Sequence, residues 1–129
     1  MKPTINMITI PVRNLEESEA FYRKLLEIPE EKISAGDDHI AFFLEQDISL
    51  VLFERKGFAE MTGQANQTFD HSTLILTHTA TSEQEVDKVL LEAEEAGGSI
   101  YKQGTSDEWS YTGYFNDPNG HVWEVIAWK

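Results

Sequence analysis

Hydrophobic and polar residues alternate over residues 5–12, so that Met7 and Thr9 share one face of the segment while larger aliphatic residues occupy the other. This period of two predicts a strand with one covered face and one available face. Asn14 follows as a predicted N-cap, and apolar residues then recur at helical spacing: Leu15, Phe21, Tyr22, Leu25 and Leu26. The chain therefore begins with a strand and an amphipathic helix.

The first helix is followed by three predicted strands. Glu27 comes directly after the Leu-Leu pair, and we expect the helix to continue a little before Pro29 ends it. The strands lie near Ile33, over residues 39–44 and over residues 48–53, with short polar turns between them.

The same pattern then starts again. Residues 72–77 alternate, and Ser82 with Glu85 forms a predicted capping box. The helix that follows buries a stripe of Val86, Val89, Leu90 and Ala93. Gly97 and Gly98 end this helix, and Asp117-Pro118-Asn119-Gly120 is the turn before the last strand. The three strands after the helix are expected over residues 99–102, 109–115 and 122–128.

The order of elements is strand, helix and three strands, repeated once. A length of 129 residues favours a single domain over residues 1–129. Within it, repeat 5–54 and repeat 71–128 are joined by residues 55–70, which show no steady period. We expect an α+β protein with two βαβββ repeats and mixed sheets.

Composition narrows the function. The net charge of −13 disfavours a nucleic-acid partner or an anionic membrane surface. Cysteine is absent, so disulfides, thiolate catalysis and cysteine zinc sites are excluded. The start of the chain has no signal-peptide pattern and no apolar run reaches membrane-spanning length. A soluble, cytoplasmic protein is the expectation.

Two blocks of sequence carry a family resemblance. The first is Ile-Thr-Ile-Pro-Val-Arg-Asn-Leu at residues 8–15, and the second is Gly-Tyr-Phe-Asn-Asp-Pro-Asn-Gly-His-Val-Trp-Glu-Val at residues 113–125. The chain resembles the vicinal oxygen chelate superfamily, which includes glyoxalase I, bleomycin-resistance proteins and extradiol dioxygenases. The resemblance implies paired, curled sheets that form a cup, a small-molecule ligand inside it, and a homodimer.

The resemblance also implies where a metal would bind. The ligand positions of the family match His71 and Glu124 in the second repeat, but Met7 and Val51 in the first. An imidazole with a carboxylate suits Zn, Mn, Fe, Co or Ni. Metal enzymes of the family mostly present three or four protein ligands, and this chain offers two. His71 and Glu124 are the candidate metal ligands and also the candidate catalytic acid and base.

Further residues are candidates for contacting a ligand in the cup. Trp109 and Tyr111 follow a polar loop at residues 104–108, so both could line the mouth and stack on a planar molecule. The candidates in the first repeat are Met7, Thr9, Phe43, Val51 and Phe53, which would form a mainly apolar wall.

Three functions stay open from the sequence. The first is a metal-dependent lyase, isomerase or transferase of the glyoxalase kind. The second is a metal-free, non-catalytic drug-binding protein of the bleomycin-resistance kind. The third is a metal-free acid–base enzyme that uses His71 and Glu124. The fold alone does not choose among them.

Overall fold

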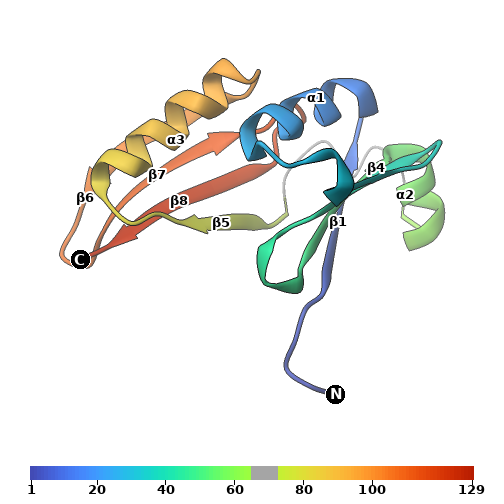
Figure 1. Ribbon diagram of the computed structural model, residues 1–129, viewed down its shortest axis with the longest axis horizontal. Helices are drawn as coiled ribbons and strands as arrows, with labels where there is room; N and C mark the ends of the chain where they lie inside the picture. The colour runs from blue at the N-terminus through green and yellow to red at the C-terminus, as the bar shows by residue number, and fades with distance from the viewer. Residues whose placement is uncertain (65–72) are drawn as a thin grey trace. The chain divides into compact units, whose positions relative to one another are not determined.

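The computed structural model describes residues 1–64 and 73–129 and contains two compact units, Met1–Phe69 and Asp70–Lys129. Each unit holds one four-stranded mixed sheet and a helix packed on it (Figure 1). The α+β class and the repeated βαβββ order predicted from the sequence are confirmed.

The first unit follows the predicted order closely. Its elements are β1 (Met7–Val12), α1 (Leu15–Leu26), η1 (Glu30–Lys32), β2 (Ile33–Ala35), β3 (His39–Phe43), η2 (Glu45–Asp47), β4 (Ser49–Glu54) and α2 (Arg55–Thr62). The strand order in the sheet is β1-β4-β3-β2, with β1 parallel to β4 and the other pairs antiparallel.

The core of the first unit lies between α1 and one face of this sheet. Ile10 and Leu52 are almost fully buried, as is Phe42, whose ring lies 6.1 Å from that of Tyr22 on α1. Burial of side chains of this size stabilises the fold by about 1.5–3 kcal/mol each. The other face of the sheet is opposite α1, and we call it the open face of the first unit.

The two ends of α1 differ in how well the sequence predicted them. Asn14 caps the N-terminus, and its Oδ1 accepts a hydrogen bond of 3.0 Å from the backbone N–H of Glu17. The expected continuation toward Pro29 is wrong, because the helix ends at Leu26 and Glu27 is left-handed, with φ of 47°. Its N–H donates to the Arg23 carbonyl, which closes the last turn.

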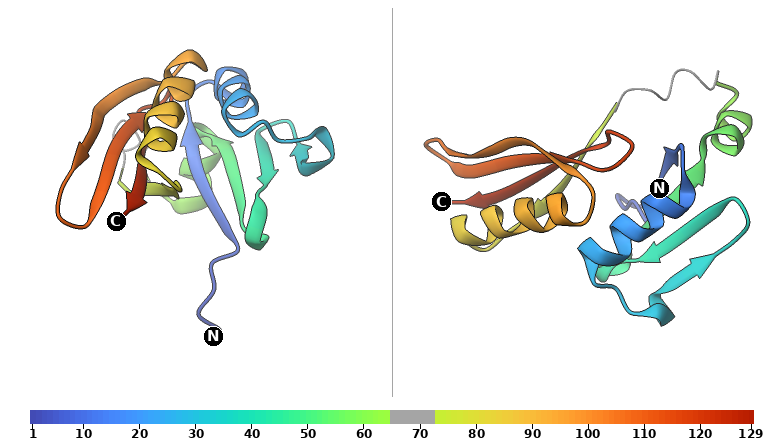
Figure 2. Two further views of the ribbon diagram at one scale, coloured as in Figure 1. Left: turned by 60° about the vertical axis from the view of Figure 1, so that its left-hand side comes forward. Right: turned by 90° about the horizontal axis from the view of Figure 1, so that it is seen from above.

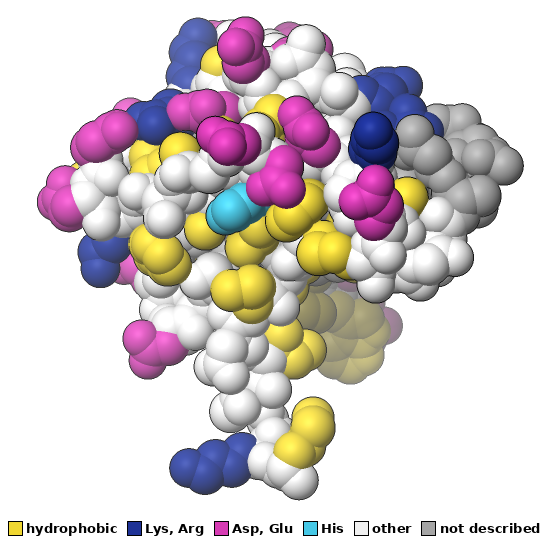
Figure 3. Space-filling view, turned by 90° about the vertical axis from the view of Figure 1, so that its right-hand side faces the viewer, with side chains coloured by type: hydrophobic (Ala, Val, Ile, Leu, Met, Phe, Trp, Pro, Cys, Tyr) yellow, Lys and Arg dark blue, Asp and Glu magenta, His cyan; other side chains and the backbone are white. Residues whose placement is uncertain are grey.

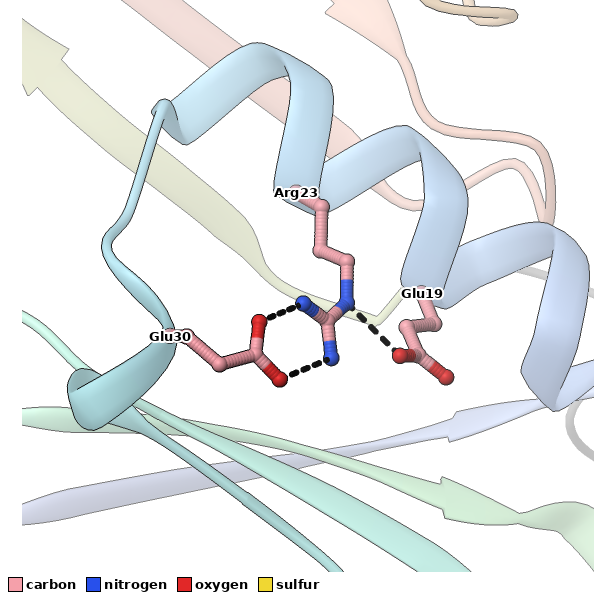
Figure 4. Close-up of polar contacts among 3 residues, drawn as sticks. All are labelled: Glu19, Arg23 and Glu30. Carbon is pink, nitrogen blue, oxygen red and sulfur yellow. Dashed lines mark hydrogen bonds and ion pairs between the residues drawn. The ribbon is translucent and has the colours of Figure 1, made fainter.

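Arg23 connects this helix end to the segment that follows. Its guanidinium donates to Glu19 at 2.7 Å and makes a two-pronged contact with Glu30 of η1 (Figure 4). The hydrogen bonds from Arg23 hold the pKa of Glu30 below its usual value. The contact therefore ties η1 back to α1 after the turn at Glu27.

The segment expected to be an irregular connection begins with a helix. α2 runs from Arg55 to Thr62 directly after β4, and it contacts β4 and β1. The ring of Phe53 lies against Gly57, where a Cβ would come within 2.6 Å of it. A helix of eight residues has too short an apolar pattern to stand out from sequence alone.

The second unit repeats the plan. Its elements are β5 (Ile75–Thr79), α3 (Glu83–Glu95), β6 (Ser99–Ser106), β7 (Ser110–Asn116) and β8 (Val122–Trp128). The strand order is β5-β8-β7-β6, with β5 parallel to β8 and the other pairs antiparallel.

α3 packs along one face of this sheet, against β6, β7 and β8 (Figure 2). The predicted stripe is confirmed at Val86, Leu90 and Ala93, which are buried. On the facing strands, Phe115 and Trp123 stack with ring centroids 5.7 Å apart. The face opposite α3 is the open face of the second unit.

The predicted Ser82 cap and the turn of the second unit are present, but only half of the predicted capping box forms. Ser82 Oγ accepts a hydrogen bond from the backbone N–H of Glu85 at 3.1 Å. In a capping box the Glu85 carboxylate would accept from the backbone N–H of Ser82. Here it accepts from the backbone N–H and the hydroxyl of Thr81, the preceding residue. Asp117 Oδ1 accepts from the backbone N–H groups of Asn119 and His121, which fixes the turn into β8.

In the described residues, no helix is both long and apolar enough to cross a membrane.

Candidate functional site

Glu124 lies in the middle of the open face of the second unit. Along β8, the buried residues Trp123 and Val125 point toward α3, so Glu124 points the other way because side chains alternate in a strand. Its neighbours across the sheet are Thr77 on β5 and Tyr114 on β7, which are its direct partners in the strand register.

Both oxygens of the Glu124 carboxylate accept a hydrogen bond from these neighbours. The Thr77 hydroxyl donates to Oε1 at 3.1 Å, and the Tyr114 hydroxyl donates to Oε2 at 2.8 Å. Hydrogen bonds to a carboxylate are among the stronger ones in proteins, and two of them fix its orientation. Glu124 is thus held in place from both sides by residues on the neighbouring strands.

The electrostatics keep Tyr114 in its donor form. The hydrogen bond to Glu124, followed by burial and the negative charge of Glu124, raises the pKa of Tyr114 above its usual 10.0. The hydroxyl therefore stays protonated at neutral pH and continues to donate to the carboxylate.

An open hollow of about 390 Å³ lies beside Glu124 on this face. Its lining combines two carboxylates with hydroxyl groups, aromatic rings and an ammonium, and includes Glu124, Asp107, Tyr114, Lys102, Trp109 and Trp128. The two tryptophans have 69% and 66% of their surface exposed, which makes them available for contact with a ligand.

A turn at Asp107 presents Trp109 to this hollow. Asp107 Oδ1 accepts hydrogen bonds from the backbone N–H groups of Trp109 at 2.7 Å and of Ser110 at 2.8 Å. These bonds, that of Trp109 first, lower the pKa of Asp107. The last residue, Lys129, donates its backbone N–H to the Trp109 carbonyl and its ammonium to the Asp107 carbonyl. The turn is therefore fixed from both sides.

Tyr111 does not lie beside Trp109, contrary to the expectation that both line one mouth. Its ring covers Gly104, and its hydroxyl donates to Asp87 of α3 at 2.8 Å, so it belongs to the face that carries the helix. Trp109 and Tyr111 are two residues apart and would share a face in a regular strand. They lie on different faces because Trp109 belongs to the turn before β7, whereas Tyr111 lies within β7.

The five candidates in the first unit share one surface. The register pairs Thr9 with Val51, Met7 with Ser49 and Phe43 with Ser49, which places these side chains on the open face of the first unit, together with Phe53. Met7 and Phe43 are exposed while Val51 is buried. Figure 3 shows hydrophobic side chains exposed in the middle of one face of the protein, with acidic side chains beside them. Of these candidates Met7 and Phe43 are accessible, and the predicted contact of the first unit with a ligand stays a prediction.

His71 lies outside the described residues, so its distance from Glu124 is not part of the structure. The register does correct one equivalence between the repeats. Val51 of the first repeat corresponds to Glu124 of the second, and their neighbours on the parallel strand are Thr9 and Thr77. Thr9 therefore corresponds to Thr77, and Met7, two residues before Thr9, corresponds to Ile75 rather than to His71.

The described residues, 1–64 and 73–129, contain no group of three or more His, Cys, Asp or Glu side chains that could hold a metal ion. Around Glu124 the described side chains are hydroxyls, and the Asp107 carboxylate and the Lys102 ammonium line the same hollow. Two carboxylates beside an ammonium are a poor ligand set for a divalent ion, which usually takes three or more protein ligands. The described residues of this face therefore do not fit a metal ion.

The family is settled by a match to a family model. The model of the Glyoxalase/Bleomycin resistance protein/Dioxygenase superfamily matches residues 4–125. The chain belongs to this superfamily. Its membership agrees with the resemblance in the two sequence blocks and covers both repeats. No curated protein matches the sequence.

Solved structures of the superfamily share the fold. A glyoxalase-related enzyme from Fulvimarina pelagi aligns with a TM-score of 0.85 and 22% identity, over 97% of this chain and 88% of that one. A superfamily protein from Nocardioides aligns with a TM-score of 0.78 and 23% identity, over 99% and 85%. A lactoylglutathione lyase from Agrobacterium tumefaciens aligns with a TM-score of 0.73 and 18% identity, over 98% of this chain and 95% of that one. At these identities the likeness shows the fold.

Sequence reasoning missed the residues that hold Glu124. The predicted turn at residues 117–120 signals a hairpin that brings Tyr114 near Glu124, but a hairpin centred on that turn pairs residue 114 with residue 123, and the observed register differs by one residue. Thr77 gave no such signal, since the register of two parallel strands is not set by a tight turn between them.

Proposed function

We propose that this superfamily member binds a small molecule on the open face of its second unit, with the Glu124 carboxylate as the polar anchor. The observation that carries the proposal is that hydroxyls on both neighbouring strands hold this carboxylate, beside an open hollow with two exposed tryptophans. A preorganised polar group in a partly apolar recess is the usual arrangement of a small-molecule site.

The chemistry of the hollow favours a ligand with a hydrogen-bond donor or a positive charge. A carboxylate has about four acceptor positions, and Thr77 and Tyr114 occupy two of them. Two carboxylates, Glu124 and Asp107, line the hollow against one ammonium, Lys102. The indole rings of Trp109 and Trp128 add flat surfaces that attract cations and planar groups.

Benzamidine is a suitable probe because its amidinium pairs with a carboxylate and its ring is flat. We expect the NMR signals of the wild-type chain to shift on titration, and Glu124→Gln to weaken binding at least about tenfold, since it removes a charge-assisted hydrogen bond. Glu108→Gln is the matched control, because Glu108 is exposed and adjacent to Trp109 but does not line the hollow. Equal affinity in wild type and Glu124→Gln would contradict the proposal.

The metal prediction from the sequence can be tested separately. The residues in question are His71 and Glu124, with Zn, Mn, Ni, Co and Fe as the candidate ions. Calorimetry on chelator-treated protein, with His71→Ala as the control, distinguishes the cases. About one ion per chain, lost in the variant, would support a metal-dependent lyase or transferase. The binding proposal does not depend on that outcome.

The non-catalytic reading and the homodimer are also proposals. Binding without turnover is supported by the Glu124 cluster, by which we mean Glu124, Thr77 and Tyr114, because Glu124 is its one usual metal ligand or acid–base group. Light scattering on the purified chain measures the number of subunits, and a mass near 14.7 kDa would contradict the dimer.

A further inference from the structure

β6 departs from regular pairing where it passes the Glu124 cluster. Ile100 pairs with Phe115, but Lys102 pairs with Tyr114, so the single step along β7 corresponds to two residues of β6. Tyr101 is the extra residue. A bulge of this kind leaves one residue unpaired and changes the direction of its side chain.

Tyr101 lies on the open face of the second unit, because Ile100 before it pairs with Phe115 on the α3 side, and the bulge keeps Lys102 on the open face as well. Its ring meets that of Tyr114 edge to face, with centroids 6.4 Å apart and an angle of 79° between the rings. Lys102, the next residue, lines the hollow on the same face. Two consecutive residues of β6 thus border Tyr114, whereas a regular strand would send one of them to the other face.

Tyr101 is also highly exposed. Its surface is 65% accessible, and its edge-to-face contact with Tyr114 leaves most of the ring uncovered. The ring is therefore held at one edge and presents its remaining surface beside the group that donates to Glu124.

We infer that Tyr101 is a specificity-determining residue of the proposed site and contacts the apolar, planar part of a ligand whose polar end binds Glu124. The inference rests on the proposed function. Tyr101 supplies an aromatic surface against Tyr114, at the edge of the hollow that Tyr114 and Lys102 line, and Trp109 and Trp128 supply aromatic surfaces in the hollow itself. Removing the Tyr101 ring affects ligands with a flat apolar part and spares ligands without one.

The test compares two probes that share an amidinium but differ in their ring. Benzamidine carries the phenyl ring, and acetamidine carries a methyl group in its place. NMR titration of the full chain gives both dissociation constants, even in the millimolar range. We expect Tyr101→Ala to weaken benzamidine binding about three- to tenfold, in line with the usual strength of aromatic contacts, and to leave acetamidine binding unchanged. Tyr101→Phe keeps the ring and should bind benzamidine as the wild type does.

The controls separate this inference from the proposed function. Leu91→Ala removes an exposed hydrophobic side chain from α3 and should affect neither probe. If Glu124→Gln weakens benzamidine and Tyr101→Ala does not, the site stands and the role of Tyr101 is wrong. If Glu124→Gln also has no effect, the proposed function fails. An equal loss of both probes in Tyr101→Ala would show that Tyr101 only supports Tyr114, which also overturns the inference.

Discussion

The two repeats place different chemistry at equivalent positions of the same sheet. In the first unit Thr9, Val51 and Ala41 lie side by side on β1, β4 and β3, and in the second unit Thr77, Glu124 and Tyr114 occupy the matching places on β5, β8 and β7. The threonine is common to both. The carboxylate stands in the repeat whose third position carries a second hydroxyl, so it has a donor on each side.

The faces that carry the helices differ as well. Gly113 on β7 occupies the position that Ile40 fills on β3 of the first unit. A Cβ on Gly113 would come within 2.6 Å of Leu90 on α3 and within 3.1 Å of the backbone carbonyl of Lys102. α3 thus approaches its sheet at a point where the first unit has a full side chain. The repeat keeps the topology and changes the packing on both faces.

The largest effect is expected when the polar centre is transferred to the first unit. Val51 is buried, with 6% of its surface exposed, and the neighbouring Ala41 offers no hydroxyl. Val51→Glu should therefore lower the free energy of unfolding by about 3 kcal/mol or more, because the new carboxylate has at most Thr9 as a donor.

Urea unfolding followed by circular dichroism measures the Val51→Glu effect. Glu124→Val in the second unit is the matched reverse exchange and should cost less, since it leaves partly exposed hydroxyls and no buried charge. A tolerance of Val51→Glu equal to that of Glu124→Val would show that the hydroxyl pair is not what permits the carboxylate.

Gly113→Ala should have the next largest effect. Part of the clash is with backbone atoms, which cannot rotate away, so we expect a loss of about 1–3 kcal/mol. All three tryptophans lie in the second unit, so their fluorescence reports its unfolding directly. Ile40→Val at the equivalent position removes a methylene instead and should cost about 1 kcal/mol. An unchanged stability of Gly113→Ala would mean that α3 can move away from the sheet without loss.

The hydrogen bond from Tyr114 to Glu124 should contribute about 1 kcal/mol. We expect Tyr114→Phe and Glu124→Val to be non-additive by about this amount in a double-mutant cycle measured by urea unfolding. Additive effects would show that the bond does not stabilise the fold.

The same bond predicts a pH dependence. Because the folded-state pKa of Tyr114 is raised, its contribution is complete below the usual value of 10.0 and is lost as the pH rises through the folded value. The wild type should therefore lose more stability than Tyr114→Phe above about pH 10. Tyr111, whose pKa is raised by its bond to Asp87, is the comparison on the other face of the sheet, and Tyr111→Phe should remove a separate part of the same loss.

The ends of the two helices give the smallest effect. Both α1 and α3 are followed by a residue with positive φ, which is Glu27 at 47° after α1 and Gly97 at 115° after α3. Glycine adopts this conformation without strain, so Glu27→Gly should stabilise the chain by about 0.5 kcal/mol, while Gly97→Ala should destabilise it by about 1 kcal/mol. Thermal unfolding measures both, and a loss of stability in Glu27→Gly would contradict this account of the helix end.

Much of the fold was predictable because its signals are local. The alternation of residues 5–12, the caps at Asn14 and Ser82, and the turn at Asp117 each depend on a few neighbouring residues, and the structure contains all of them. The end of α1 was not predictable in the same way. Glu27 takes a backbone conformation that its residue type disfavours, because the turn toward β2 and the Arg23 contacts require it.

The candidate site was predicted only at its centre. Glu124 could be placed on the available face of its strand by alternation, but its partners come from elsewhere in the chain. The position of Thr77 depends on a parallel register, and the presence of both Tyr101 and Lys102 beside Tyr114 depends on a bulge that the sequence does not mark. The prediction for Tyr111 was wrong because it assumed that Trp109 and Tyr111 belong to one regular strand, whereas Trp109 lies in the turn at Asp107. Long-range register and irregular pairing determine this site, and neither is written in short segments.

The most direct test of this account is to map where benzamidine binds on the wild-type chain. The indole N–H signals of Trp109, Trp123 and Trp128 are three separate reporters, and Trp123 faces α3 rather than the hollow. We expect the signals of Trp109 and Trp128 and of the amides around Glu124 to shift on titration, while those of Trp123, Thr9 and Val51 do not. Shifts centred on Thr9 and Val51, with none at Glu124, would contradict this expectation.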